Sequence, residues 1–498
     1  MQSKSHSILK SSFWSYLGVF VLMFVGLITN IVLARLLDKD NWGVFSTLIA
    51  VVSFLSAISE LGLNYYIIYS TSKYAEKGEK EVRKHLSAPL RYKLILLLSI
   101  SVLMVIFSNQ LADIFHIPNG AIYFVASAVY FFFSNLFGVF LGILDGLKKF
   151  KEDSLISAGQ YILRLIFSVL LVIFGFGLDG AVAGYIIAVA IGTVIEYYLL
   201  RQVISISEKA TESLSEMLSF GFYFGLVSIA GSFTLWTDSV MIGIFVGTTA
   251  VGIYRIAVSL SSAASSLLNG ISKVVFPYFT SAEAEGKDSI KELNKALKYG
   301  LFISVPAMFG IILSAEGVVK ATFGPQYMDS TLPLIILSYL VLDGVIVGLI
   351  SSYLAAKKET KIIGHSSLIA AVINVVLNLI LIPIFGMVGA ALTSLFSRLV
   401  NLGLILKWSQ QRLGKTYDFP IILPLIGSIV MSAFLLLLKS FIDPAESIIH
   451  LLVFIGSGIA VYLVTEQIIG FDVIGFGKKI MKAVVPDNLI RFVPFNLD

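Results

Sequence analysis

The sequence predicts an all-α polytopic membrane protein with fourteen transmembrane helices. Apolar and aromatic residues make up 57% of the 498 residues, whereas charged residues make up only 13%. An average soluble domain contains about 25% charged residues. Long uncharged stretches recur along the whole chain, and about 20 apolar residues are enough to cross a bilayer as a helix. These observations exclude a soluble globular protein.

Fourteen segments are long and apolar enough to span a membrane. They run over residues 13–34, 43–70, 90–109, 120–144, 155–176, 179–200, 217–245, 251–276, 299–322, 331–355, 362–384, 387–408, 419–438 and 447–469. Glycine-containing connections at 175–177, 247–249 and 385–387 predict tight hairpin turns between successive spans. The first segment has no cleavage motif of small residues after it, so we expect it to remain in the mature protein.

Lysine and arginine gather on one side of the predicted membrane. Most of the 36 Lys and Arg residues fall at the N-terminus, in the connections after even-numbered spans and in the C-terminal tail. Because basic connections stay in the cytoplasm, both termini are expected to be cytoplasmic. This distribution also accounts for the formal charge of +5 without a nucleic-acid partner. The charged connections 76–93 and 285–298 are expected to rest on anionic membrane lipids.

The chain also repeats itself at a spacing of 209 residues. Lys148-Lys149 recurs as Lys357-Lys358, and Gly43 recurs as Gly252. Each copy holds six spans, an even number, so both enter the membrane in the same direction as parallel repeats. The predicted parts are an N-terminal lobe (1–201), a cytoplasmic linker (202–216), a C-terminal lobe (217–415), two extra C-terminal helices (416–469) and an interfacial tail (470–498).

Cysteine and histidine usage narrows the chemistry. The chain has no cysteine and only five scattered histidines. A disulfide, a thiolate nucleophile and a zinc site built on cysteine or paired histidines are therefore excluded. We expect no metal and no cofactor.

Ionisable groups inside the predicted spans mark the candidate site, because a charge in a bilayer is costly and usually functional. Four arginines are candidate substrate-binding cations of a cavity: Arg35, Arg164, Arg255 and Arg398. Three acids are candidates for ion pairing or for coupling: Glu60, Asp238 and Asp343. Guanidinium is the preferred partner of phosphate, so the arginines favour a phosphate-bearing amphiphile as substrate. The acids could instead pair with the arginines or carry a coupling proton or sodium ion.

Simpler interpretations apply to other charges. Glu316 and Lys320, like Asp145 and Lys149, are four residues apart and predict pairs along one helix. By contrast, Asp238 and Arg255 flank the turn at Gly247 at similar depth, about 12 Å below it at 1.5 Å per residue, and predict a pair between neighbouring helices.

Four further positions complete the embedded polar set. Glu196 and Glu466 lie within two turns of the predicted cytoplasmic ends, where their side chains are expected to reach the interface. Asn374 and Asn378 lie one turn apart and could bond across helices or line a cavity.

Several short motifs resemble the polysaccharide flippases of the MOP (multidrug/oligosaccharidyl-lipid/polysaccharide) transporter superfamily. They are ARLL at 34–37, WGVF at 42–45, LGL at 61–63, VGIYRIA at 251–257, FP at 276–277 and FGPQY at 323–327. The resemblance covers the first twelve spans and agrees with a total of fourteen. Only Arg35 and Arg255 lie in stretches that align directly with the family.

This resemblance implies a MATE/MOP-like fold with two lobes that rock around a central cavity. It also implies a Wzx-like flippase rather than an enzyme. Such a protein moves polyprenyl-(pyro)phosphate-linked oligosaccharide across a prokaryotic plasma membrane by alternating access. The expected partners are the lipid-linked oligosaccharide, membrane lipids and a coupling ion, H⁺ or Na⁺.

Three alternatives remain open at this point. One is a flippase of the peptidoglycan lipid precursor, and another is a multidrug exporter of the same superfamily. A third is a membrane glycosyltransferase or polymerase, because Asp38-Lys39-Asp40 is a D-x-D pattern of the kind that binds a metal or a sugar phosphate.

Overall fold

The computed structural model describes residues 18, 21–60, 62–205, 214–286, 289–414, 417–473 and 475, and their regular structure is helical. Within these residues, ten helical stretches are long and apolar enough to cross a membrane. The multi-pass helical architecture predicted from composition is therefore confirmed. The count of fourteen spans remains a prediction, since two of the ten stretches, Phe150–Leu200 and Thr360–Leu413, each cover two predicted spans.

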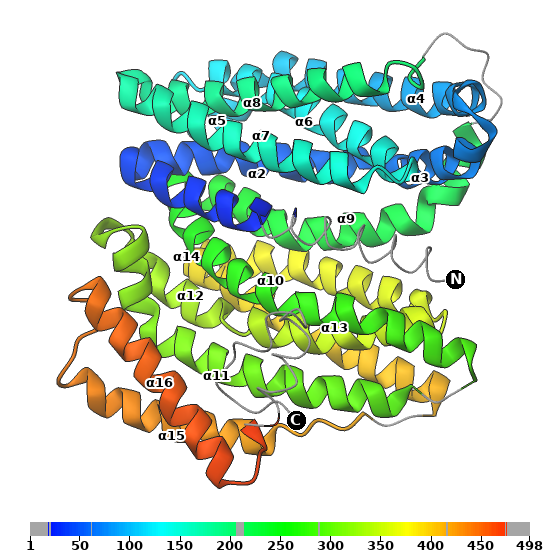
Figure 1. The fold of residues 1–498 in the computed structure, drawn as a ribbon. Coiled ribbons are helices and arrows are strands. Elements are labelled where there is room, and N and C mark those ends of the chain that lie inside the picture. The colour runs from blue at the N-terminus through cyan, green and yellow to red at the C-terminus, as the bar shows by residue number, and fades with distance from the viewer. Residues whose placement is uncertain are drawn as a thin grey trace, which may run out of the picture. The chain divides into compact units, whose positions relative to one another are not determined.

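Long helices follow one another along the chain (Figure 1). After an apolar helix at Val21–Leu36 come α2 (Lys39–Glu60), α3 (Leu63–Tyr74), η1 (Ala75–Lys77), α4 (Glu79–Ile106), α5 (Ser108–Ile114), α6 (Ala121–Gly146), α7 (Phe150–Leu171), the π turn η2 (Val172–Phe176), α8 (Gly177–Leu200), α9 (Leu214–Phe245), α10 (Thr248–Ala284), α11 (Ile290–Thr322), η3 (Pro325–Ser330), α12 (Thr331–Leu337), α13 (Leu340–Ala356), α14 (Thr360–Leu413), α15 (Ile422–Lys439) and α16 (Ile448–Ile468).

The three predicted glycine turns are present. Gly247 has a φ of 118°, a left-handed value that favours glycine. Gly177 (φ 49°, ψ −129°) and Gly386 (φ 58°, ψ −135°) share one unusual conformation, and they are 209 residues apart (177 + 209 = 386). Gly386 divides α14 into a first arm before it and a second arm after it.

The helices form two compact units. The first comprises Met1–Ala263, Phe323–Leu337 and Glu359–Leu413, and the second comprises Ala264–Thr322, Ser338–Lys358 and Gly414–Asp498. In the first unit α2 packs on α6, α8 and α9, α7 packs on α8, and α9 packs on α14. These helices run side by side in Figure 1. The predicted lobes 1–201 and 217–415 remain a prediction.

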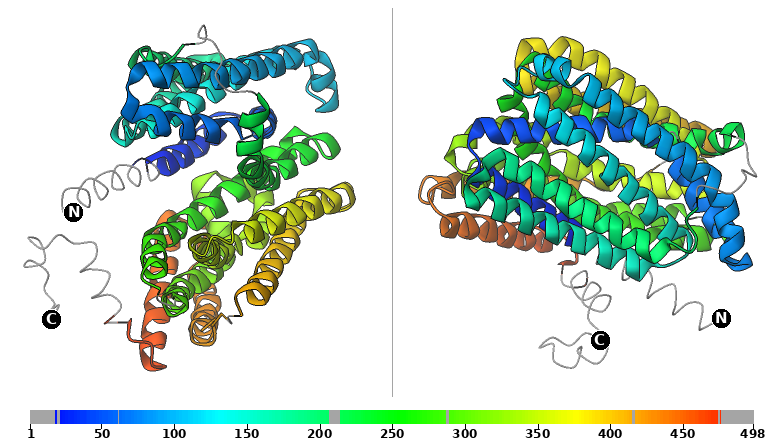
Figure 2. Two further views of the ribbon diagram at one scale, coloured as in Figure 1. Left: turned by 90° about the vertical axis from the view of Figure 1, so that its right-hand side faces the viewer. Right: turned by 90° about the horizontal axis from the view of Figure 1, so that it is seen from above.

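The second unit is built around α11. This helix packs on α13, α15 and α16, and the last two pack on each other, as the orange and red helices of Figure 2 show. A core of buried apolar residues joins them: Phe302, Met431, Leu435, Phe454, Tyr462 and Phe471. The two helices predicted after the repeat are thus an integral part of this unit.

The lysine pairs of the repeat end two helices in the same way. Just after α6, Lys148 adopts a φ of 60°, and just after α13, Lys358 adopts a φ of 62°. The equivalent residues are therefore 210 residues apart (148 + 210 = 358), one more than the spacing of 209 read from the sequence. Both helices end in the same backbone conformation. However, it falls on the first lysine of one pair and on the second lysine of the other.

Several predicted charge assignments are wrong. Lys93 was expected in a basic connection, yet its side chain is 1% exposed within α4, and its Nζ donates to the Ser59 carbonyl at 2.8 Å. Glu316 pairs with Lys439 at 3.0 Å rather than with Lys320. In both cases a neighbouring helix offers a closer partner than the local sequence does.

Two glutamates expected to reach the interface are also buried. Glu196 on α8 and Glu466 on α16 are both 0% exposed, and neither carboxylate has a hydrogen-bond partner among the described residues. Residues 206–213 of the predicted cytoplasmic linker (202–216), the N-terminal lysines Lys4 and Lys10 and most of the tail (476–498) lie outside the described residues.

Candidate functional site

A small polar pocket in the first unit surrounds Arg164 of α7. The cavity measures about 250 Å³. Its lining residues come from helix Val21–Leu36 and from α6, α7 and α8: Leu22, Tyr130, Ser134, Phe137, Leu141, Ser157, Gln160, Tyr161, Arg164 and Val189. Hydroxyl, amide and guanidinium groups therefore face one space inside a helical bundle.

Two aromatic rings hold the Arg164 guanidinium. Its Cζ lies 3.8 Å from the centroid of the Tyr161 ring and 4.8 Å from that of Tyr185. The π faces of these rings stabilise the cation without neutralising it. The Arg164 Nε is buried and lacks a hydrogen-bond partner among the described residues. The guanidinium thus retains a donor for an anionic ligand.

A second polar cluster centres on Asp238 of α9, which is 2% exposed. Its Oδ2 accepts hydrogen bonds from Tyr254 Oη at 2.8 Å and from Ser394 Oγ at 2.5 Å, and its Oδ1 accepts one from Asn378 Nδ2 at 2.6 Å. The donors come from α10 and from both arms of α14. The prediction that Asn378 bonds across helices is confirmed.

Further oxygens lie near this carboxylate. Asn378 Nδ2 also donates to Asn374 Oδ1 at 3.1 Å. The buried Asn378 Oδ1 has no hydrogen-bond partner in the part of the chain that the structure describes. A carboxylate with amide and hydroxyl oxygens around it is the type of donor set that hard cations prefer.

The expected pair of Asp238 and Arg255 is not formed. Asp238 bonds to Tyr254, the residue before Arg255, whereas the Arg255 Cζ lies 4.1 Å from the centroid of the Trp236 ring. Equal depth brought both residues to the same level, but the helical rotation of α10 turns Tyr254 toward the carboxylate. Arg255 is held by an aromatic ring, as Arg164 is.

The other predicted site residues lie apart from these two clusters. Glu60 ends α2 and accepts a hydrogen bond from Asn64 Nδ2 at 2.9 Å. Asp343 lies in the first turn of α13, in the second unit, and is 8% exposed. Arg398 is half-buried on the second arm of α14, and Arg35 is exposed near the end of helix Val21–Leu36. A cavity shared by all seven residues remains a prediction.

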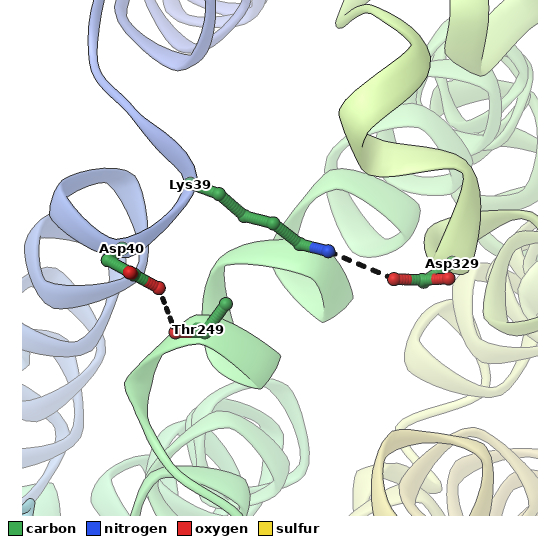
Figure 3. A network of polar contacts seen from close by, with 4 residues as sticks. All are labelled: Lys39, Asp40, Thr249 and Asp329. Carbon is green, nitrogen blue, oxygen red and sulfur yellow. Dashed lines mark hydrogen bonds and ion pairs between the residues drawn. The ribbon is translucent and has the colours of Figure 1, made fainter.

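A third group of polar contacts joins the connections that are predicted to lie on the outer side (Figure 3). Lys39 Nζ lies 3.0 Å from Asp329 Oδ2, and Thr249 Oγ1 donates to Asp40 Oδ1 at 2.6 Å. These side chains are exposed or half-exposed, so each pair contributes about 0.2–1 kcal/mol. We call the contact between the start of α2 and the segments at Thr249 and Asp329 the outer contact.

Buried groups reinforce the outer contact. Trp42 Nε1 donates to the Gly252 carbonyl at 3.1 Å, and Tyr327 Oη donates to the Ala34 carbonyl at 2.8 Å. The Cα of Gly43 lies only 2.9 Å from where a Cβ on Gly252 would be, and a Cβ on Gly43 would lie 2.6 Å from the Thr248 carbonyl oxygen. Two helices can meet this closely only because both residues lack a side chain.

The D-x-D pattern serves this local structure. Asp38 is the N-cap of α2, since its Oδ1 accepts the backbone N–H of Asn41 at 2.8 Å and that of Asp40 at 3.0 Å. The Asn41 N–H holds the pKa of the Asp38 carboxyl below its usual range, so the stabilisation by this cap is lost as the pH falls through that lowered pKa. Asp40 accepts a hydrogen bond from Thr249. The D-x-D pattern therefore gives no support to a glycosyltransferase site.

Sequence reasoning missed Tyr130, Tyr161, Tyr185 and Tyr254 as partners of the embedded charges. Their rings belong to spans whose composition is otherwise apolar, and a tyrosine there is ordinarily a core residue. The only usable signal was position, because Tyr161 precedes Arg164 by three residues and Tyr254 adjoins Arg255.

Known proteins resemble the chain over nearly its whole length. A probable low-salt glycan biosynthesis flippase of Haloferax volcanii is 23% identical over 465 residues, covering 93% of this chain and 94% of that protein. Among solved structures, the lipid II flippase MurJ in an inward closed conformation superposes with a TM-score of 0.75 at 19% identity, covering 92% of this chain and 99% of that one.

A second solved structure shares the fold. An inward-facing multidrug resistance MATE family transporter of the MOP superfamily superposes with a TM-score of 0.64 at 16% identity, covering 80% of this chain and 98% of that one. These likenesses confirm the predicted MATE/MOP-like fold. The model of the family described as polysaccharide biosynthesis protein matches residues 8–283, more than half of the chain. The chain therefore belongs to the polysaccharide biosynthesis protein family.

Proposed function

We propose that the protein is a flippase that translocates polyprenyl-(pyro)phosphate-linked oligosaccharide across the plasma membrane by alternating access. Membership of the polysaccharide biosynthesis protein family supports a glycan as the transported group. Similarity to a glycan biosynthesis flippase over 93% of the chain supports the transport of that glycan in a lipid-linked form. The same relatives favour a transporter over a glycosyltransferase or a polymerase.

The observation that carries the proposal is the Arg164 pocket. A permanently charged guanidinium lies among tyrosine, serine and glutamine side chains within the first unit, and its Nε has no hydrogen-bond partner among the residues that the structure describes. A pocket of about 250 Å³ is too small for an oligosaccharide but suits one phosphate group. The Arg164 guanidinium would hold the phosphate, while the glycan occupies a larger aqueous space and the lipid tail stays in the bilayer.

The Asp238 cluster is proposed as the site of the coupling ion. A buried carboxylate surrounded by amide and hydroxyl oxygens can bind a sodium ion, or it can be neutralised by a proton. Either event changes the charge balance of a network that ties α9 to α10 and α14. Ion binding there would bias the relative arrangement of these helices, which is what coupling requires.

The outer contact supports alternating access. Two of its bonds are weak surface pairs, which separate at little cost, and its close glycine contact holds the helices together while they are in place. In the proposed orientation, with both termini cytoplasmic, this state is closed on the outer side. Transport then requires the outer contact to open.

Replacing Arg164 by Gln tests the substrate site. A charge-assisted hydrogen bond contributes about 1.5–3 kcal/mol, so Arg164→Gln is expected to lower substrate affinity by roughly 10- to 100-fold. The measurement is transport of a fluorescent polyprenyl-pyrophosphate oligosaccharide in reconstituted vesicles. Arg201→Gln, which removes an exposed arginine at the end of α8, serves as the matched control. Unchanged transport in Arg164→Gln, or equal loss in both variants, would remove the phosphate role from this pocket.

A parallel measurement separates the possible substrates. Vesicles that receive the peptidoglycan lipid precursor instead of the lipid-linked oligosaccharide should show little transport. Faster movement of the precursor would assign the protein to that substrate and refute the glycan proposal, whatever the outcome at Arg164.

Replacing Asp238 by Asn tests the coupling site, because it keeps the shape and removes the charge. Transport driven by an imposed sodium or proton gradient is expected to fall about tenfold or more, while transport without a gradient changes little. Ser394→Ala removes one donor and keeps the charge, and it should retain the gradient dependence. If Asp238→Asn responds to the gradient as the native protein does, the ion is bound elsewhere.

A further inference from the structure

A groove of about 700 Å³ lies between the two ends of α14. The first arm enters near Glu359 and the second arm leaves near Arg412, so the walls are the opening and closing turns of a single helical hairpin. The rim carries Lys361, His365, Arg412 and Glu359. The mechanism proposed above uses none of these residues.

The rim is cationic in its balance. Glu359 Oε1 binds Arg412 Nε at 3.1 Å, which neutralises one arginine. Lys361 and His365 are exposed, and in the described part of the chain neither has a carboxylate within ion-pair distance. The Lys361 ammonium and the His365 imidazole therefore line the groove without a carboxylate partner among the described residues.

The floor of the groove is apolar. Leu368 and Ile369 are 40% and 39% exposed, and both line the groove. They follow Lys361 and His365 on one face of the first arm, at the spacing of i, i+4, i+7 and i+8. Seven residues of helix place the floor about 10 Å below Lys361. Trp408 faces them from the second arm, and tryptophan prefers the boundary between headgroups and acyl chains.

We propose that this groove binds an anionic phospholipid, with its phosphate at Lys361 and His365 and the upper part of an acyl chain over Leu368 and Ile369. Basic pockets between membrane helices on the cytoplasmic side are suited to acidic headgroups. The site goes beyond the flippase function, and only its assignment to the inner leaflet depends on the proposed orientation.

The lining distinguishes a phospholipid from the lipid-linked oligosaccharide. All charged and amide groups of the groove lie in the outermost turns, at positions 359, 361, 365, 411 and 412, and the lining below them is apolar apart from the Trp408 indole. A glycan would need hydroxyl, amide or carboxylate partners beyond the phosphate. A compact headgroup with an acyl chain beneath it needs only the polar rim and the apolar floor that are present.

The first test compares lipid binding to the purified full-length protein by native mass spectrometry. Phosphatidylglycerol and phosphatidylethanolamine with the same acyl chains are added at equal concentration, and phosphatidylglycerol is expected to be retained in preference. In Lys361→Gln/His365→Gln this preference should fall about fivefold, the effect of removing roughly one basic contact of 1 kcal/mol. Lys407→Gln removes an exposed lysine at the same end of the second arm but outside the groove, and it should keep the preference.

A second test locates the lipid. Phosphatidylglycerol with brominated acyl chains should quench the fluorescence of Trp408, so quenching should be larger in the native protein than in Trp408→Phe. Equal loss of preference in the groove variant and in Lys407→Gln would reduce the effect to general electrostatics and overturn the proposal. So would an absence of preference in the native protein, or displacement of phosphatidylglycerol by an equal concentration of polyprenyl phosphate. Proper folding of each variant is checked by its thermal unfolding temperature.

Discussion

At the scale of single residues, the embedded charges differ in how the fold supports them. Arg164 and Arg255 rest against aromatic rings, whereas Asp238 collects three hydrogen bonds. Aromatic support leaves a cation available to a ligand, whereas the three hydrogen bonds tie the Asp238 carboxylate to α10 and α14. This contrast is why the arginine pocket is assigned to the substrate and the aspartate to the ion.

Gly43 gives a sharp prediction at this scale. A methyl group there would meet backbone atoms of Thr248 and Thr249 within 2.8 Å, and backbone cannot move aside as a flexible side chain can. Overpacking of this kind costs about 1–3 kcal/mol, so Gly43→Ala should open the outer contact. Labelling of Thr249→Cys by a membrane-impermeant maleimide should be faster in the Gly43→Ala background than in the native one.

The control for Gly43→Ala is Gly138→Ala, because a Cβ at Gly138 would meet no atom within 4 Å. Labelling at Thr249→Cys should be the same in Gly138→Ala as in the native background. Slow labelling in Gly43→Ala would show that the glycine contact does not hold the outer side closed.

The sequence predicted which charges are embedded but not which residues they meet. Depth below a turn follows from counting residues, so Asp238 and Arg255 were correctly placed at one level. The direction in which a side chain leaves its helix depends on its position around the helix axis, and a difference of one residue rotates it by about 100°. That rotation brought Tyr254 to Asp238 in place of Arg255.

At the scale of elements, the glycine turns were the most predictable feature. A turn of one or two residues between antiparallel helices requires a positive φ, which only glycine adopts without strain. The ends of long helices were less predictable, as α4 continues from the connection at 79 into the membrane without a break. Buried Lys93 could not be recognised, because its carbonyl partner lies on another helix.

Gly177 and Gly386 allow a test at the element scale. Both have a φ near +50° with a strongly negative ψ, and neither has an atom closer than 4.0 Å to a built Cβ. The effect of alanine there is backbone strain alone, about 1–3 kcal/mol for each position. Gly177→Ala and Gly386→Ala should each lower the thermal unfolding temperature, and by similar amounts. Gly159→Ala has equally open surroundings without a positive φ, so it should leave that temperature nearly unchanged or slightly raised.

At the scale of the whole molecule, two contacts join residues that lie at the predicted repeat spacing. Asp40 and Thr249 are separated by the repeat spacing of 209 residues, and their side chains bond to each other. Gly43 and Gly252 are also 209 residues apart (43 + 209 = 252), and their backbones meet. Residues related by the predicted repeat therefore contact their own equivalents at the outer contact.

A crosslink across these equivalents tests alternating access. The chain has no cysteine, so Asp40→Cys/Thr249→Cys introduces the only thiols. Oxidation is expected to trap the outer contact closed and to stop transport by more than about tenfold, and a reductant should restore it. The two single-cysteine variants should be insensitive to oxidant. Full transport by the crosslinked protein would exclude opening at this contact.

If the predicted repeat arose by duplication, the close contact of Gly43 and Gly252 has a consequence for ancestry. When a residue touches its own repeat mate, the axis relating the two copies passes close to that point. An ancestor made of two separate six-span chains would have placed Gly43 of one subunit against Gly43 of the other. A single mutation would then have introduced two side chains into one contact, whereas in the fused chain each glycine can change alone. On this prediction, gene fusion released the position from its symmetric constraint, and yet residues 43 and 252 are both glycine.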